Sequence, residues 1–538
     1  MTRVRRATSK GKIGFWEIYS IGVGGMIGGG IFATLGLSLE LARGAAPLAF
    51  AFAGLIALLT SYSYAKLSAR YPSMGGTIEF LVRAYGDNIL TGGLNVMLLG
   101  SYIVMVALYA YAFGSYGASL VPSHYAEAYV ILVIIAIGSL TFVNLLGAVV
   151  SGRVELGLVL FKLSVLLFVA AIGLKEIDWA RLSPANWPPI VNVIAGGMII
   201  FLAYEGFELI ANTAADAENT TILRKALYAA VVTVISVYVL IATVSAGALS
   251  LEVIKKARDY ALAVLVKPVL GEPGALLVIA AALASTSSAI NATLYGTARM
   301  SYLVAKYGQI PRIFGRRIWR GAYEGLLIIS LLSLLLALGA SLEAISAAGS
   351  GGFLIIFTAV NLAAYKLRRE TGANPAITLT AAAMSSVALV ILLWRMYQLN
   401  PDRLAVLAGL IIGSLITEYL YRALTGRRIQ EVVDPRLRER ERLLARWEDL
   451  ARSIASIVKR ILREAEIYII GSHARNQPHM AGDLDILIVT DKPLSREDKE
   501  RLEEIVEREL NLPKGHPVHI HTITRDKLEQ IREKKRIS

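Results

Sequence analysis

Three charged side chains lie inside long apolar stretches of this chain, where a charge is costly and therefore needs an explanation. Glu205 and Glu208 interrupt one apolar run, and Lys162 is the one charged residue in the stretch 156–164. A charge at the centre of a bilayer costs about 2.5 to 3.5 kcal/mol on insertion scales, so such groups are candidates for binding or ion coupling. For the two glutamates the alternative is a protonated or paired role in packing.

A second group of chemically active residues lies near the end of the sequence. Asp483 and Asp485 are two residues apart in a strand-like apolar run. Their carboxylates would therefore face the same side of a strand, as a divalent metal site with oxygen ligands requires. The preceding Gly471-Ser472 turn offers backbone N–H groups to a phosphate. Two aspartates at this spacing are weak evidence by themselves.

The first apolar stretch is rich in glycine, and each Gly costs about 1 kcal/mol of helix propensity. Its glycines are Gly22, Gly24, Gly25, Gly28, Gly29 and Gly30. One interpretation is close helix packing through small-xxx-small spacing. The other is a segment unwound at mid-membrane, whose N–H groups would take a carboxylate and whose C=O groups would take an ammonium. Gly206 disturbs the sixth stretch at the equivalent position of a second five-helix half, and this pairing favours the unwound segment.

The elements that must position these residues are membrane-spanning helices. The chain has 538 residues, of which 55% are hydrophobic and 18% charged. Its apolar stretches of about 20 residues are long enough to cross a hydrocarbon core of about 30 Å, so residues 1–425 are expected to form an all-α polytopic membrane protein. We expect twelve spans, beginning near Phe15, Pro47, Leu90, Tyr125, Val154, Ile190, Ala226, Pro273, Ala322, Leu342, Ala376 and Leu404.

The basic residues predict how these spans are oriented. Lys and Arg gather before the first span and in the loops after spans two, eight and ten, all on one side of the membrane. The positive-inside rule makes that side cytoplasmic, so both termini of a plasma-membrane protein would be cytoplasmic. The first span lacks a cleavage site and is expected to be retained. The formal charge of +14 belongs mostly to these loops, so no nucleic acid partner is predicted, and the absence of cysteine excludes disulfides.

Four motifs in register resemble the amino acid, polyamine and organocation (APC) superfamily. They are Gly25-Met26-Ile27-Gly28-Gly29-Gly30-Ile31-Phe32, the stretch 64–72 with Gly75-Gly76, the stretch 201–208 with Asn219, and the stretch 305–311. The resemblance implies a leucine-transporter-like fold of five plus five inverted helices, two further helices, and alternating access around a central site. This chain departs from the pattern at Asn219-Thr220, where the family often has Asn-Pro, and at Gly29, where it often has a hydroxyl residue.

The same resemblance implies a substrate site between the broken first and sixth helices. The N–H groups expected to receive a substrate carboxylate belong to Ile27, Gly28, Gly29 and Gly30. The carbonyls expected to receive its amino group lie near Val23, Ala203, Tyr204 and Gly206. The candidates for the side-chain pocket are Tyr102, Met105, Tyr109 and Phe207. Aromatic residues in a third span also serve packing or the interfacial belt, and that alternative stays open.

The coupling ion is open between a proton and sodium. Burial disfavours the charged form of Lys162, so this side chain could carry a proton, and some superfamily members similar to this chain have a lysine there in the place of a sodium ion. Others bind sodium through first-helix carbonyls and span-eight hydroxyls, which here belong to Ser285, Thr286, Ser287 and Ser288. We favour the proton, because an ammonium group would repel sodium at close range. The residues assigned to ion coupling are Lys162, Glu208, Ser287 and Ser288.

The C-terminal part is expected to form two further segments. Residues 426–465 form a charged amphipathic linker helix, with apolar residues at helical period between Arg436 and Arg463. Residues 466–538 resemble a minimal DNA polymerase β-like nucleotidyltransferase, which makes this segment a small cytoplasmic α/β domain. The residues that carry the resemblance are Gly471-Ser472-His473-Ala474-Arg475 and Asp483-Leu484-Asp485.

The nucleotidyltransferase resemblance implies two binding roles. Nucleotide would bind at Gly471, Ser472 and Arg475, and Mg²⁺ at Asp483 and Asp485. The family usually adds a third carboxylate from a later strand, and the candidate strand 517–523 carries His519 and His521 instead. A regulatory or inactive domain, an active transferase and a structural appendage are open, and the incomplete acidic set favours the first.

The sequence as a whole predicts a secondary transporter of amino acids or related organic cations rather than an enzyme, with no cofactor for transport itself. Its expected partners are the small-molecule substrate, the lipid bilayer and, at the tail, a nucleotide. The competing interpretation is a membrane-anchored nucleotidyltransferase, but an anchor needs one span and not twelve.

Overall fold

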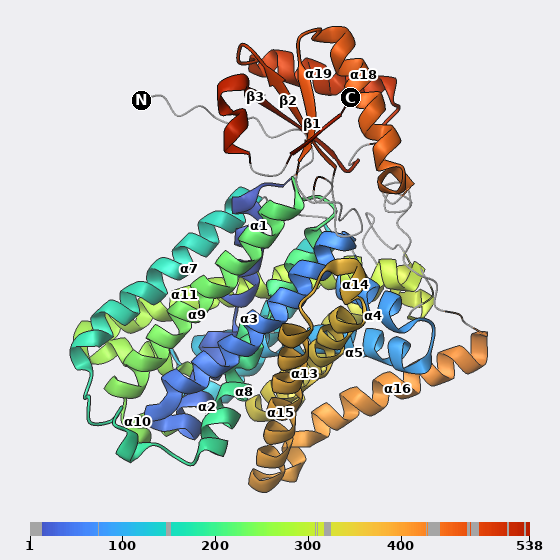
Figure 1. The fold of residues 1–538 in the computed structure, drawn as a ribbon. Helices are drawn as coiled ribbons and strands as arrows, with labels where there is room; N and C mark the ends of the chain where they lie inside the picture. The colour runs from blue at the N-terminus through green and yellow to red at the C-terminus, as the bar shows by residue number, and fades with distance from the viewer. Residues whose placement is uncertain are drawn as a thin grey trace.

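The protein, seen in a computed structural model, consists of a helical membrane body followed by a small α/β domain (Figure 1). The residues that the structure describes are 13–73, 75–146, 152–306, 308, 310–316, 324–426, 428, 442–470, 474, 484–513, 516–531 and 534–537.

Long apolar helices make up the membrane body. They are α1 (Phe15–Met26), α2 (Gly30–Ala42), α3 (Ala46–Arg70), α5 (Ile89–Ala118), α6 (Tyr125–Leu145), α7 (Gly152–Gly173), α8 (Ile190–Phe201), α9 (Thr220–Ala248), α11 (Ala261–Lys306), α12 (Glu324–Gly339), α13 (Leu342–Lys366), α15 (Pro375–Leu399) and α16 (Ala405–Thr425). Shorter helices connect them: α4 (Thr77–Tyr85), α10 (Leu251–Lys256) and α14 (Arg368–Thr371).

The helices account for the predicted spans. Ten stretches of the described chain are long and apolar enough to cross a membrane. One of them, Gly30–Arg70, contains both α2 and α3 and so counts as two spans, with α1 and α2 as two halves of the first. The shorter α12 then makes up the twelve predicted spans. The predicted start at Ala322 lies outside the described residues, and α12 is seen from Glu324.

Local sequence signals set the helix ends. The side chain of Asn219 caps α9 by accepting a hydrogen bond from the N–H of Ile222 at 2.8 Å, so this Asn ends the preceding loop without the proline that often follows it. Asn88 caps α5 in the same way through the N–H of Thr91, at 2.9 Å. Helix α11 is bent at Gly271, whose φ of 62° is non-helical. The predicted start of span eight at Pro273 therefore lies just beyond this bend.

The small domain is a four-stranded sheet with helices on one face. The sheet contains β1 (Glu466–Ile470), β2 (Leu484–Thr490), β3 (Val518–Thr524) and β4 (Lys534–Arg536) in the order β3-β2-β1-β4. Strands β2 and β3 are parallel and the other pairs antiparallel. Alternate β2 residues Leu484, Ile486 and Ile488 share a core with α18 (Trp447–Ile461) and α19 (Arg496–Glu509). Thus α18, which falls inside the segment 426–465 expected as a linker, packs on the sheet.

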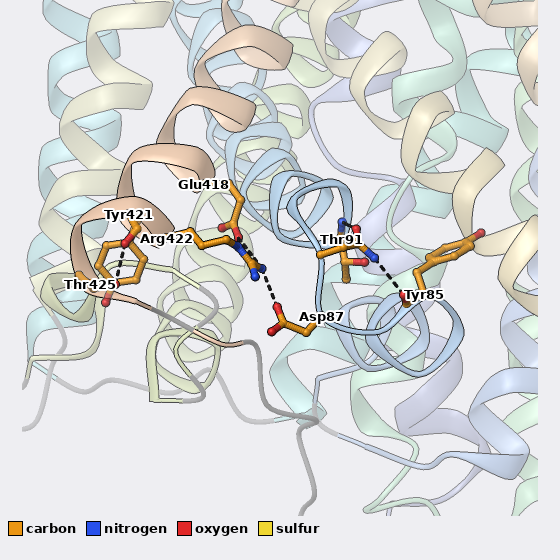
Figure 2. Close-up of polar contacts among 8 residues, drawn as sticks. Tyr85, Asp87, Thr91, Glu418, Tyr421, Arg422 and Thr425 are labelled. Atoms are coloured by element: carbon orange, nitrogen blue, oxygen red, sulfur yellow. Dashed lines mark hydrogen bonds and ion pairs between the residues drawn. The ribbon is translucent and has the colours of Figure 1, made fainter.

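A cluster of charges ties the last membrane helix to the start of α5 (Figure 2). Arg422 of α16 donates through Nη2 to Asp87 at 2.6 Å, and to the Oε1 of Glu418 at 3.1 Å. Glu418 is 1% exposed, and a methyl group on Gly92 would overlap its carboxyl group. Residue 92 must therefore be small for the Glu418 carboxyl group of α16 to pack against α5.

We expect Arg422→Ala to lower the stability of the membrane body by about 3 kcal/mol, because it removes the guanidinium group that pairs with the buried Glu418 carboxylate. The double variant Arg422→Ala/Glu418→Gln should recover part of the loss, since no buried charge remains. Thermal unfolding of the detergent-purified protein measures both, with Arg369→Ala, at an exposed arginine, as the control. Equal midpoints for Arg422→Ala and the control would show that the cluster contributes nothing.

Candidate functional site

The first membrane span is broken in the middle. Helix α1 ends at Met26 and α2 begins at Gly30, and Ile27 between them has φ −83° and ψ 62°, outside the helical region. The break confirms the unwound segment that the glycine-rich stretch predicted. It exposes backbone polar groups, which membrane proteins tolerate at this depth only when protein or a water-filled cavity satisfies them.

The sixth span is broken at the matching place. Helix α8 ends at Phe201 and a 3₁₀ turn covers Leu202–Tyr204. Glu205 is extended, Gly206 has φ 124°, and a second 3₁₀ segment runs over Phe207–Thr213. The positive φ of Gly206 is a conformation that side-chain-bearing residues rarely adopt, which explains the glycine.

The two breaks pack against each other through their backbones. A methyl group on Gly206 would lie 2.5 Å from the N of Met26, and one on Gly30 would lie 2.7 Å from the Cα of Ala203. The hydroxyl of Tyr238, on α9, is placed to donate to the carbonyls of both breaks, at 2.7 Å from Met26 O and 3.3 Å from Ala203 O. This face of the first break is therefore occupied by the second.

The other face of the first break lies against α5 and α11. A methyl group on Gly28 would lie 2.9 Å from the Cβ of Ala289 and 3.2 Å from the Cζ of Tyr109. A methyl group on Gly29 would lie 2.6 Å from the Cδ1 and 3.0 Å from the Cα of Tyr109. Gly28 and Gly29 therefore pack on Tyr109 and α11, whereas Gly30 lies in the contact between the breaks.

Glu208 holds the second break in shape. Its Oε2 accepts a hydrogen bond from the N–H of Gly206 at 2.7 Å, and its Oε1 accepts one from the hydroxyl of Tyr102 at 3.3 Å. Its side chain is buried, and groups of the protein donate hydrogen bonds to both of its carboxylate oxygens. Glu208 was assigned to ion coupling from the sequence, and its contacts show that it also caps the unwound segment.

The remaining candidates for the substrate site are buried and differ in their surroundings. The ring of Phe207 packs against Tyr64 and Phe357, with centroids 5.6 and 5.2 Å apart, so it belongs to an aromatic cluster. Met105 on α5 and Val23 on α1 are buried in the same hydrophobic core. Tyr204 is buried, with its hydroxyl donating to the carbonyl of Phe50 at 2.9 Å.

The hydroxyl that reaches the first break belongs to Ser285 of α11. Its Oγ lies 3.2 Å from the carbonyl of Ile27 and 3.1 Å from that of Gly28. Ser287 and Ser288, the pair assigned to ion coupling, are half-buried one turn away or less. Lys162 is 2% exposed on α7, a helix that packs on α1, α9 and α11. The lysine thus faces protein, as its position in the apolar stretch predicted.

In the small domain the structure brings Asp485 of β2 next to His521 of β3. The Nε2 of His521 lies 3.1 Å from the Oδ1 of Asp485, and His519 is the register partner of Asp485 on the parallel strand. The predicted strand with histidines in place of a third carboxylate is therefore β3. The other residues assigned to this site, Gly471, Ser472, Arg475 and Asp483, lie outside the described residues.

Sequence reasoning missed Tyr238 and gave no specific role to Ser285 or Glu205. Tyr238 carries no signal, because a tyrosine within an apolar span usually packs. Ser285 was only one of four adjacent hydroxyl residues, and the helical phase that selects it depends on where α11 meets α1. Glu205 was noted as an intramembrane charge without a role, although its buried position beside Gly206 makes it part of the second break.

The chain was compared with known families and proteins. A family model described as amino acid permease matches residues 13–415, and one described as nucleotidyltransferase domain matches residues 451–538. The chain is 36% identical over 420 residues to an uncharacterized protein of Methanocaldococcus jannaschii, which covers 77% of this chain and 96% of that protein. It is 31% identical over 409 residues to the inner membrane transport protein YbaT of Escherichia coli, covering 75% of this chain and 95% of that protein.

Among solved structures, the fold is similar to that of a manganese transporter from Eremococcus coleocola. The TM-score is 0.52 at 13% sequence identity, covering 77% of this chain and 95% of the other. At this identity the similarity concerns the fold alone, and it supports the membrane architecture described above.

We expect Gly206→Ala to destabilise the protein by at least about 3 kcal/mol, because the new methyl group would overlap the backbone of α1 in a strained conformation. Gly138→Ala on α6 is the matched control, since a methyl group there meets open space and a helical Ala is favoured by about 1 kcal/mol. Thermal unfolding in detergent separates the two. If both variants unfold at the wild-type temperature, the backbone contact between the breaks is not formed.

Proposed function

The chain belongs to the amino acid permease family, and from this we propose that it is a secondary active transporter of amino acids or related organic cations. It works by alternating access at the two broken helices, in the plasma membrane, with both termini cytoplasmic. The observation that carries the proposal is the pair of facing breaks, one of which leaves Gly28 and Gly29 between two helices and against Tyr109.

The chemistry of a zwitterionic substrate fits this arrangement. An amino acid carries a carboxylate, which suits the N–H groups of an unwound helix, and an ammonium, which suits freed carbonyls. Rotation of Tyr109 away from Gly28 and Gly29 would open the amide side to the ligand. Tyr238 and Ser285 keep the neighbouring carbonyls satisfied while the segment stays unwound.

Proton coupling is the second part of the proposal. Lys162 is buried on α7, which packs on α1, the helix that leads into the first break, and a lysine in that place can bind and release a proton. In its charged form it also disfavours sodium nearby. Lys162 would thus link the protonation state of the body to the position of α1.

Uptake into proteoliposomes tests the transport proposal. The purified protein is reconstituted and offered a panel of labelled amino acids and amines under an imposed proton gradient, an imposed sodium gradient, or neither. We expect saturable uptake of at least one amino acid, faster with the proton gradient. Uptake that follows sodium and ignores pH would overturn proton coupling, and no uptake or exchange of any amino acid would overturn the function.

For Lys162→Ala we expect uptake to lose its dependence on the proton gradient, so that the ratio of rates with and without the gradient falls to about one, while exchange of internal for external substrate persists. The reason is that the variant lacks the group that binds the proton. The control is Lys267→Ala, at a half-exposed lysine paired with Glu272 on the surface of α11. A variant that remains driven by the gradient would remove Lys162 from the coupling mechanism.

We further propose that the small domain binds a nucleotide with Mg²⁺ and has a regulatory rather than a catalytic role. Carboxylates are the ligands that Mg²⁺ prefers, and Asp485 lies on the sheet face opposite the helices. Its neighbour His521 brings no negative charge to a metal when neutral. The ligands therefore carry too little negative charge to favour nucleotide transfer. Binding of the nucleotide to this domain would then regulate transport by the membrane body.

The full-length protein should bind a fluorescent ATP analogue in the presence of Mg²⁺ and lose roughly 10-fold in affinity in Asp485→Asn, because one metal ligand loses its charge. Asp491→Asn, at an acid paired with Arg525 beyond the same strand, is the control and should bind like the wild type. Rapid transfer of the nucleotide to a protein or RNA acceptor would overturn the inactive assignment. Absence of Mg²⁺-dependent binding would make the domain a structural appendage.

A further inference from the structure

Glu205 is a buried acid whose carboxylate has no hydrogen-bond partner among the described residues. It is fully buried, and neither Oε1 nor Oε2 is hydrogen-bonded. The residue sits in extended conformation between the 3₁₀ turn of Leu202–Tyr204 and Gly206, in the middle of the second break. A buried carboxylate without a partner is costly, so this acid either holds a proton or pairs with a cation that comes from outside the protein.

The other buried glutamates in the described part of the chain are all bound. Glu79, Glu343 and Glu418 each pair with an arginine, and Glu208 accepts hydrogen bonds from Gly206 and Tyr102. The contrast within the second break is direct, because Glu208 is only three residues from Glu205 yet is bound on both oxygens. Glu205 is thus not needed to hold the break in shape.

Glu205 lies next to the contact between the two breaks, because its neighbour Gly206 packs on the backbone of Gly25 and Met26. Glu208, three residues further along, brings a second acid rather than a cation to this part of the break. On the other face of the first break, the ring of Tyr109 lies against Gly28 and Gly29. The carboxyl group without a partner and the unwound glycines therefore belong to the same pair of facing breaks.

We propose that Glu205 binds a cationic group on the substrate's side chain, so that the preferred substrates are amino acids with a second positive charge, such as lysine or arginine. The inference rests on the proposed transport function. A ligand that replaces the Tyr109 ring would contact the amides of Gly28 and Gly29 with its carboxylate and Glu205 with its distal cation. Ion pairing inside protein would then supply the missing partner of the carboxylate.

The first test uses the wild-type protein. In proteoliposomes, lysine should compete for uptake at least about 10-fold better than norleucine, which has the same chain without the distal ammonium; this ratio corresponds to about 1.4 kcal/mol. Putrescine, which lacks the carboxylate, should compete poorly. Norleucine or leucine competing as well as lysine would overturn the role of Glu205 and leave the transport function standing.

The second test is Glu205→Gln, which keeps the shape of the side chain and removes its charge. We expect a loss of at least about 10-fold in affinity for lysine and arginine with little change for neutral amino acids, and Glu205→Asp should keep the preference for lysine. Glu272→Gln, at an exposed acid on α11, is the control for the loss of one negative charge. Uptake lowered equally for all substrates, together with a lost dependence on pH, would assign Glu205 to proton binding and overturn the proposal.

Discussion

The membrane body depends on one constraint, which is that backbone N–H and C=O groups inside a bilayer must find partners. The first and sixth spans leave the helical conformation at facing positions, and side chains from other helices meet freed carbonyls in both. Tyr238 reaches Met26 and Ala203, and Ser285 reaches Ile27 and Gly28. These contacts come from α9 and α11, so the position of both helices follows from the breaks.

The same constraint explains which parts could be predicted from the sequence. The spans follow from apolar length alone, and the breaks follow from Gly28 and Gly206 because glycine is disfavoured in a helix without a local reason. The partners of the breaks could not be predicted, since Tyr238 and Ser285 are chosen by the rotation of α9 and α11 about their axes. The different surroundings of Gly28 and Gly30 could not be predicted either, because they depend on which elements pack beside the first break. A side chain lies beside Gly28, whereas backbone lies beside Gly30.

In the small domain, too, some features could be predicted from the sequence and others could not. Alternation along β2 predicted which residues face one way, and Leu484, Ile486 and Ile488 do form one core with the helices. The parallel pairing of β2 with β3 brought Asp485 to His521, and no local pattern determines that pairing. Among the residues that the structure describes, an imidazole therefore lies next to the Asp485 carboxylate, on the strand where the sequence has histidines.

The ring of Tyr109 lies against Gly28 and Gly29, so at the proposed site the protein itself fills the space that a ligand would take. A ligand bound there would exchange places with a phenol ring, and its measured affinity would be the difference between two occupants rather than the strength of its own contacts. A small ligand that left the ring in place would gain none of the contacts beneath it. A ligand large enough to displace the ring would gain those contacts and the volume that the ring gives up, so the site would discriminate by size.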